Sequence, residues 1–241
     1  MTALLKIEKV SKNFGGFAAL SGVDLEIAQG ERFGLIGPNG SGKTTLINCV
    51  SGALRNERGS IRFDGEEVSR LPAYQRTRRG IARSFQIPRP FKSMSVLDNL
   101  MVPLEYVAHR RLLHLDDVHG EAMGILKGMG LADKAQTPSS QLSQVELRKL
   151  ELARAMAARP RLLISDEAMA GLSGSEVDEV LKILFDLNAK GITIIMIEHI
   201  MQAVMRFSQR VVCLDAGRII CEGTPASIVQ DPHVQKAYLG A

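Results

Sequence analysis

Hydrophobic residues near the start of the chain recur at every second position, which is typical of half-buried β-strands. Leu5, Ile7 and, after a slip, Val10 share one side, and over residues 23–27 Val, Leu and Ile alternate with Asp and Glu. Residues 59–65 add a short strand with an Asp-Gly turn. This pattern predicts an antiparallel β region.

The spacing becomes helical between about residues 95 and 158. Pro103 and the turn-rich stretches 128–130 and 137–140 are expected to divide this region into segments, because proline and glycine interrupt helices. We therefore expect a helical insertion in the middle of the chain.

Short apolar runs on both sides of this insertion predict buried strands at residues 32–36, 162–164 and 192–197. Residues 177–188 carry an apolar stripe at helical spacing, and residues 211–220 predict a hairpin. Strands that alternate with helices indicate an α/β fold with a mainly parallel sheet.

Residues 37–44, Gly-Pro-Asn-Gly-Ser-Gly-Lys-Thr, complete the pattern G-x-x-x-x-G-K-[ST] between the strand 32–36 and a helix predicted over 45–50. Glycine tolerates positive φ, so successive N–H groups can point inward around an anion. In this pattern Lys43 reaches the terminal phosphates and Thr44 offers a hydroxyl to Mg²⁺. A glycine-rich turn could match by chance, but the flanking strand and helix favour a nucleoside triphosphate site.

Two adjacent carboxylates, Asp166 and Glu167, follow the apolar strand 162–164. A protein with a phosphate loop needs a second acidic site for Mg²⁺ and a group that activates water. We expect Asp166 to hold Mg²⁺ through its water and Glu167 to polarise the attacking water. Without the phosphate loop upstream, an Asp-Glu pair would be weak support for a catalytic site, since a strand can simply end in a polar turn.

Composition adds limits to this interpretation. With 45 % hydrophobic and 23 % charged residues among 241, the chain is an ordinary globular protein. Its formal charge of +4 is too small and too dispersed to indicate nucleic-acid binding. The densest basic stretch, residues 76–79, is interpreted as a solvated face, with a patch near the nucleotide or a membrane as the alternative.

With Gln86 and His199 added, the chain resembles the ATPase subunit of an ABC transporter over almost its whole length. The order of motifs is that of the family: phosphate loop, glutamine loop, helical insertion, signature stretch, Asp-Glu strand and a later histidine. The resemblance implies a P-loop NTPase domain over residues 1–241, with an antiparallel β subdomain and a helical subdomain at roughly 95–158.

The resemblance also implies roles for single residues. Gln86 would reach Mg²⁺ and the water, His199 would contact the γ-phosphate, and Phe14 would stack on adenine; without the family, the last two would be taken for structural residues. The expected ATP-binding residues are Phe14, Gly37, Pro38, Asn39, Gly40, Ser41, Gly42, Lys43, Thr44, Thr45, Gln86 and Asp166. The expected Mg²⁺ ligands are Thr44, Gln86 and Asp166, and the expected catalytic residues are Glu167, His199 and Lys43.

Finer details resemble the ABC ATPases that serve branched-chain amino acids, namely the stretches 84–91 and 94–100 and the ending at 222–240. This implies an importer of such amino acids or similar small solutes, with MgATP hydrolysed at a dimer interface and integral-membrane permease subunits as partners. No apolar run approaches the roughly 18 residues of a membrane span, and the N-terminus is no secretory signal. We therefore expect a cytoplasmic protein, held at the inner face of the membrane by the permease.

The signature stretch departs from the family pattern Leu-Ser-Gly-Gly-Gln. Here residues 142–146 keep Ser143 but place Val145 at the key glycine and Glu146 at the glutamine. In the family this element contacts the γ-phosphate that the partner subunit binds. Either Ser143 and the helix N-terminus are enough to bind the partner's γ-phosphate, or the altered signature weakens one of two ATP sites in a heterodimer. We favour a mild form of the second hypothesis, in which this chain's own signature makes a slower site.

Other functions stay open at this point. ABC ATPases that export lipopolysaccharide have a similar ending, and soluble ABC ATPases act in DNA repair, translation or cofactor assembly. The long arms or fused second domain that often mark the repair and translation types are not seen in 241 residues. A P-loop kinase is disfavoured by Gln86, His199 and the signature helix. The cargo, the direction of transport and the identity of the second ATPase subunit do not follow from the sequence.

Overall fold

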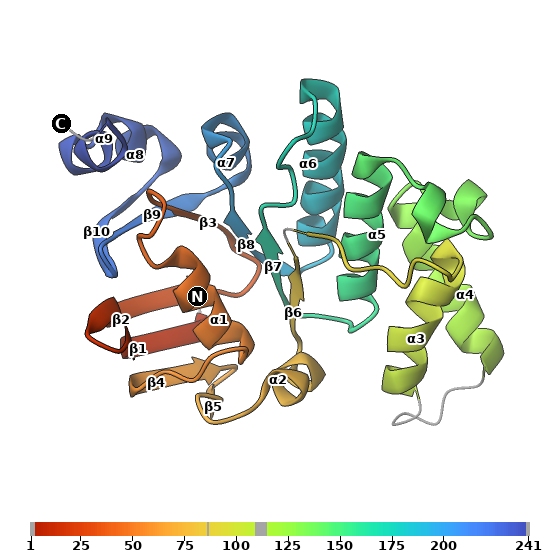
Figure 1. Ribbon diagram of the computed structural model, residues 1–241, viewed down its shortest axis with the longest axis horizontal. Coiled ribbons are helices and arrows are strands. Elements are labelled where there is room, and N and C mark those ends of the chain that lie inside the picture. The colour runs from red at the N-terminus through yellow and green to blue at the C-terminus, as the bar shows by residue number, and fades with distance from the viewer. Residues whose placement is uncertain (1–2, 86, 109–114, 240–241) are drawn as a thin grey trace.

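The computed structural model describes residues 3–85, 87–108 and 115–239, which form two sheets with helices around them (Figure 1). Strand order is β10-β9-β3-β8-β7-β6 in the larger sheet and β2-β1-β4-β5 in the smaller. The strands are β1 (Ala3–Phe14), β2 (Phe17–Ala28), β3 (Arg32–Ile36), β4 (Arg58–Phe63), β5 (Glu66–Glu67), β6 (Ile81–Ser84), β7 (Leu162–Asp166), β8 (Thr193–Ile197), β9 (Arg210–Asp215) and β10 (Arg218–Gly223). The α-helices are α1 (Lys43–Ser51), α2 (Ala73–Arg79), α3 (Val96–Ala108), α4 (Leu115–Gly128), α5 (Gln144–Met156), α6 (Gly174–Ala189), α7 (Met201–Phe207), α8 (Pro225–Gln230) and α9 (Pro232–Leu239).

The central strands of the larger sheet, β3, β7, β8 and β9, are buried, as their apolar residues require, whereas the edge strand β10 is partly exposed. Successive side chains of β8 point to opposite faces. Ile195 and Ile197 belong to the core shared with α1 and the small sheet, whereas Ile194 and Met196 belong to the core shared with α5, α6 and α7. β3 pairs in parallel with β8 and β9, and β7 pairs in parallel with β6 and β8. The predicted α/β fold with a mainly parallel sheet is confirmed.

The predicted antiparallel region is the four-stranded sheet, in which β1 pairs with β2 and β4. Leu5, Ile7 and Val10 are all buried in one core, as their spacing predicted. The slip before Val10 is a register shift, and Lys9 there has a φ of +50°. The hairpin predicted within residues 211–220 is formed by β9 and β10.

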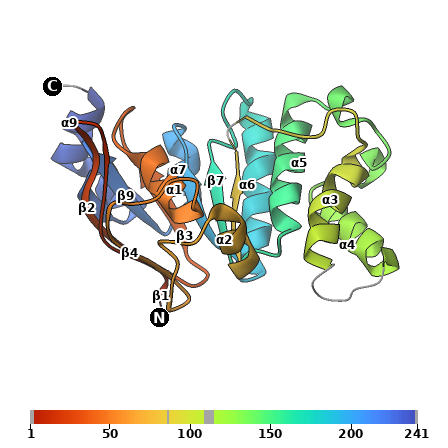
Figure 2. The same ribbon diagram turned by 60° about the horizontal axis from the view of Figure 1, so that its bottom comes forward.

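The helices α3, α4 and α5 gather at the end of the molecule away from the small sheet (Figures 1 and 2). The expectation that Pro103 divides this region is wrong, because α3 continues through it. Leu100 and Leu104, on either side of the proline, are almost completely buried. Burial of two leucines, at about 2 kcal/mol each, offsets the roughly 3 kcal/mol that an interior proline costs. Among the described residues, no helix is both long and apolar enough to span a bilayer.

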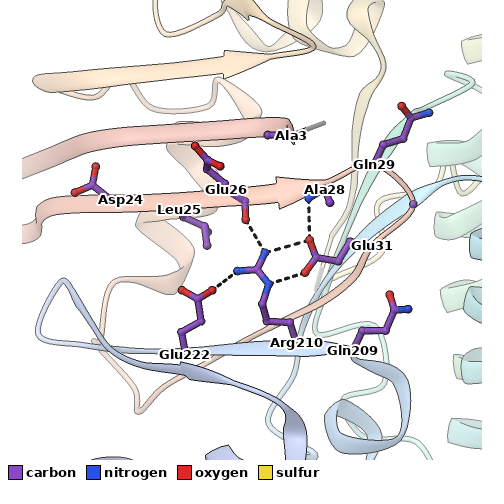
Figure 3. Close-up of a pocket in the computed structure, with 11 residues that line it drawn as sticks. Ala3, Asp24, Leu25, Glu26, Ala28, Gln29, Glu31, Gln209, Arg210 and Glu222 are labelled. Carbon is purple, nitrogen blue, oxygen red and sulfur yellow. Dashed lines mark hydrogen bonds and ion pairs between the residues drawn. The ribbon is translucent and has the colours of Figure 1, made fainter. Parts of the chain in front are cut away.

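Arg210 of β9 links the two sheets (Figure 3). Its guanidinium donates to both carboxylate oxygens of Glu31, at 2.7 and 3.1 Å, and to Glu222 Oε1 at 2.5 Å. A further bond of 2.6 Å reaches the carbonyl oxygen of Glu26 in β2. These groups line a cavity of about 830 Å³, and because they satisfy one another we interpret it as a structural joint.

Arg76 corrects the interpretation of residues 76–79 as a solvated face. Arg78 and Arg79 are exposed, but Arg76 is only 1 % exposed. Its guanidinium donates to the carbonyl oxygens of Cys49 and Val50, at 2.5 and 2.9 Å, in the last turn of α1. The last carbonyls of a helix have no partner within the helix, so Arg76 supplies the missing donors.

The same guanidinium also binds the carbonyl oxygens of Leu71 and Ser69, at 2.9 and 3.0 Å. Arg76 therefore ties the end of α1 to the segment that leads from the small sheet into α2. Charge alone does not reveal this role, because the acceptors are backbone atoms set by the fold.

We expect Arg76→Met to lower the free energy of unfolding by about 3 kcal/mol, because three buried carbonyl groups and one partly buried carbonyl group lose their donor while the apolar stem is kept. Urea denaturation would measure the change. The matched control Arg79→Met removes an exposed pair with Glu66 and should cost less than about 1 kcal/mol. Equal stabilities of the two variants would contradict the role assigned to Arg76.

Candidate active site

The phosphate loop joins the end of β3 to the start of α1, as predicted. Gly37 has a φ of +148°, and a Cβ there would overlap the carbonyl oxygen of Leu214. Gly42 has a φ of +108°, and a Cβ there would lie 2.6 Å from the carbonyl oxygen of Ala19. Only glycine fits at these two positions, because both the backbone conformation and the space exclude a side chain.

The start of α1 offers donors that the protein itself leaves available. Gly42 caps the helix without a side chain, and Ser41 Oγ is buried with no hydrogen-bond partner in the described part of the chain. Lys43 Nζ donates to the carbonyl oxygens of Gly37 and Pro38 at 2.7 and 3.0 Å, and burial lowers the pKa of this ammonium. A helix N-terminus with free amides and a buried cation suits an anionic ligand.

Glu167 follows β7 in a strained conformation, with a φ of +48°. Its N–H donates to the carbonyl oxygen of Ile197 at 2.8 Å, and its Oε1 lies 3.1 Å from His199 Nε2. A non-glycine residue in this region costs about 1–2 kcal/mol, and such strain concentrates at functional sites. The two side chains therefore form a carboxylate–imidazole pair at the carboxyl ends of β7 and β8.

A cavity of about 240 Å³ brings most of the predicted residues together. It is lined by Phe14, Phe17, Ala19, Asn39, Gly40, Ser41, Gly42, Lys43, Thr44, Thr45, Glu167 and His199. The cavity beside Arg210 is larger, but its charged groups pair with one another. The smaller cavity holds the uncapped helix start and the strained glutamate, so we take it as the candidate site.

Asp166 lies beside this cavity and already has a partner. It is 7 % exposed and its Oδ2 is 2.5 Å from a guanidinium nitrogen of Arg83, whose other nitrogen donates to Asn48 Oδ1 at 2.6 Å. Arg83 was not predicted as a site residue, since nothing local in the sequence distinguishes it from the nearby arginines. Gln86 falls outside the described residues.

The signature residues lie away from the cavity, at the start of α5. Ser143 and Glu146 form a capping box, in which Ser143 N–H donates to Glu146 Oε2 at 2.8 Å and Glu146 N–H donates to Ser143 Oγ at 3.4 Å. The Glu146 carboxylate is also paired with Lys134. Val145 is partly buried against the hydrophobic core. The N-terminus of α5 is thus capped by its own side chains.

Glu198 is a buried acid that the sequence interpretation missed. It is 2 % exposed and accepts a hydrogen bond of 2.9 Å from the N–H of Met169, two residues after Glu167. Burial raises the pKa of this carboxyl to about 7. It links the segment of His199 to the loop after Glu167. The signal was present, because Glu198 directly follows an apolar strand just as Glu167 does.

Two family models match the chain. The model described as ABC transporter matches residues 20–170, and the one described as branched-chain amino acid ATP-binding cassette transporter matches residues 218–241. The high-affinity branched-chain amino acid transport ATP-binding protein BraF of Pseudomonas aeruginosa is 36 % identical, with 98 % of each chain covered. LivG of Salmonella typhimurium, which carries the same description, is also 36 % identical over 98 % of each chain.

Solved structures agree with this similarity. The crystal structure of the ADP conformation of an ATP-binding cassette of an ABC transporter superposes with a TM-score of 0.91 and 30 % identity, covering both chains completely. A dimeric post-hydrolysis cassette bound to ADP and Pi superposes with a TM-score of 0.82 and 25 % identity, covering 92 % of this chain and 98 % of that one.

The raised pKa of Glu198 predicts how stability changes with pH. The folded chain keeps this proton up to about pH 7, whereas an unfolded glutamate releases it near 4.5, so the contribution to stability falls as pH rises between these values. Glu198→Gln keeps an acceptor for Met169 but has no charge to bury. Its stability relative to the unchanged chain should rise by about 2 kcal/mol between pH 5 and 8.

Urea denaturation at several pH values would measure this difference. The matched control Glu105→Gln removes an exposed carboxylate, so its difference from the unchanged chain should stay constant. A constant difference for Glu198→Gln would contradict the burial of an ionisable proton at this position.

Proposed function

Since this chain belongs to the ABC transporter family of ATP-binding subunits, we propose that it powers an importer of branched-chain amino acids or similar small solutes. Its ATPase activity follows from the family, and the nature of the cargo is our proposal. Two findings support this cargo. The branched-chain family model matches residues 218–241, and the relatives described as branched-chain amino acid transport proteins match over 98 % of their length.

The observation that carries the mechanism is the single cavity shared by the phosphate loop, Glu167 and His199. We assign the loop amides and the buried Ser41 hydroxyl to the phosphates of ATP. Lys43 would move from the carbonyl groups it now contacts to the terminal phosphates. Phe14, 48 % exposed at the rim, would stack on the base.

Glu167 and His199 would carry out the proton chemistry. Glu167 would accept a proton from the attacking water, and His199, whose Nε2 lies 3.1 Å from that carboxylate, would orient it and contact the γ-phosphate. Mg²⁺ would neutralise charge on the phosphates. Thr44 lines the cavity and would offer its hydroxyl to the ion. Asp166 would turn its carboxylate from Arg83 to the ion, and Gln86 is proposed as a third ligand.

Transport would follow from the movement of permease subunits that hold the chain at the inner face of the membrane. Two ATPase subunits would close on ATP and open after hydrolysis. ATP can drive this cycle only because it binds the closed state more tightly than the open one. We treat residues 1–241 as one ATP-binding domain, with residues 95–158 as its helical subdomain.

The capped N-terminus of α5 supports the hypothesis that the two ATP sites of the dimer are unequal. The N–H of Ser143 is engaged by Glu146, whose carboxylate is also paired with Lys134, so this N–H is not available to a partner's γ-phosphate. Val145 adds a branched side chain to the same turn. We propose that this chain pairs with a different ATPase subunit, whose signature serves the intact site built on Lys43, Asp166, Glu167 and His199.

Glu167→Gln should lower the ATPase rate of the assembled complex by at least about 100-fold, because the amide accepts no proton from water. ATP binding should be retained, whereas Lys43→Ala should weaken it. Cells that carry Glu167→Gln should lose uptake of radiolabelled leucine while the complex still assembles in the membrane.

These measurements separate two errors. A normal ATPase rate in Glu167→Gln would show that the base is misassigned. A lost ATPase rate with normal leucine uptake would show that the cargo is a different solute.

Val145→Gly should raise the ATPase rate of the assembled complex by about twofold. Without the branched side chain, the start of α5 can approach the γ-phosphate bound by the partner more closely, which would speed the slower of the two ATP sites. The matched control is Val229→Gly, which removes an exposed valine from α8 and should leave the rate unchanged. An unchanged rate in Val145→Gly would count against the unequal pair.

A further inference from the structure

Tyr238, near the end of α9, touches the first residue of the phosphate loop. Its hydroxyl oxygen accepts a hydrogen bond of 2.8 Å from the N–H of Gly37, across 201 positions of sequence. The residue is 39 % exposed, and partial burial raises the pKa of the phenol further above its ordinary value near 10, at which the hydroxyl is already neutral at physiological pH. The last helix of the chain is therefore in direct contact with the loop.

The position of α9 is fixed by contacts at its other end. The carboxylate of Asp231 accepts the N–H groups of His233 and Val234 at 2.8 and 3.2 Å, which caps the helix. The thiol of Cys221 in β10 donates to Asp231 Oδ2 at 3.1 Å. Val234 is 4 % exposed within the larger core. The helix is thus attached to β10 and the core, and it delivers Tyr238 to the loop.

Gly37 is restrained on several sides. Tyr238 holds its N–H, Lys43 Nζ holds its carbonyl oxygen at 2.7 Å, and Leu214 leaves no room for a Cβ. If Lys43 moves to the phosphates of a bound nucleotide, the contact with the carbonyl oxygen ends. Tyr238 then keeps the start of the loop in place while the lysine moves.

We propose that Tyr238 is a positioning residue for the phosphate loop, and that α9 thereby sets the affinity of this chain for MgATP. The proposal rests on the proposed function, because it takes the loop to bind ATP. By linkage, ATP binding and the docking of α9 strengthen each other by the same factor.

Tyr238→Phe in the full chain removes only the hydroxyl and leaves the Gly37 N–H without its partner. Calorimetric titration should show the Kd for MgATP rising by about tenfold, since a buried unpaired amide costs on the order of 1–3 kcal/mol. In the assembled complex, KM for ATP should rise while kcat changes little. Amide hydrogen exchange at Gly37 should become faster, by about tenfold.

The matched control is Tyr74→Phe, which removes a hydroxyl from a tyrosine that is 53 % exposed on α2. Its Kd for MgATP and its exchange at Gly37 should equal those of the unchanged chain. A Tyr238→Phe variant with the same two values would overturn the proposal. A fall in kcat at constant KM would overturn it as well, because a restraint on the loop acts on binding.

The failure of the proposed function looks different. If the unchanged chain does not bind MgATP, the assignment as an ATPase fails together with the role of α9 in affinity. Exchange at Gly37 then decides separately whether Tyr238 restrains the loop, since that measurement needs no nucleotide.

Discussion

The site depends on one constraint, the close packing of the loop backbone that leads from β3 into α1. It fits only because Gly37 and Gly42 lack side chains, the first against the carbonyl of Leu214 and the second against that of Ala19. Leu214 belongs to the large sheet and Ala19 to the small one, so the loop is fixed where the two sheets meet. The free amides of α1 therefore face a cavity lined by residues of the small sheet and by residues that follow strands of the large one.

Features with a local cause could be predicted from the sequence. The loop has a fixed spacing, because its amides must converge on one anion. The strands β7 and β8 contain the apolar runs 162–164 and 194–197, which is typical of strands covered on both faces. Parallel strands also place their carboxyl ends together, which is why Glu167 and His199 meet although 32 positions separate them. The roles of these residues toward ATP, and those of Gln86 and the signature stretch, stay predictions.

Features whose partners are distant backbone atoms could not be predicted. The charge of Arg76 suggested a solvated face, yet its acceptors are the last carbonyls of a helix 26 positions earlier. Pro103 suggested a helix end, yet packing of its neighbours outweighs its cost. The contact between Tyr238 and Gly37 joins two parts of the chain that nothing in either local sequence connects. In each case tertiary packing, not local preference, decides the outcome.

If Tyr238 positions the loop as proposed, that last contact adjusts the candidate site from outside the loop sequence. The loop residues are constrained by phosphate chemistry, so changing them changes the reaction itself. A hydroxyl that binds a backbone N–H makes no demand on the loop sequence, because every residue except proline has that donor. On this proposal, changes in the C-terminal segment would alter nucleotide affinity while Lys43, Asp166 and Glu167 stay as they are. Affinity and catalysis would then be tuned by different parts of the chain.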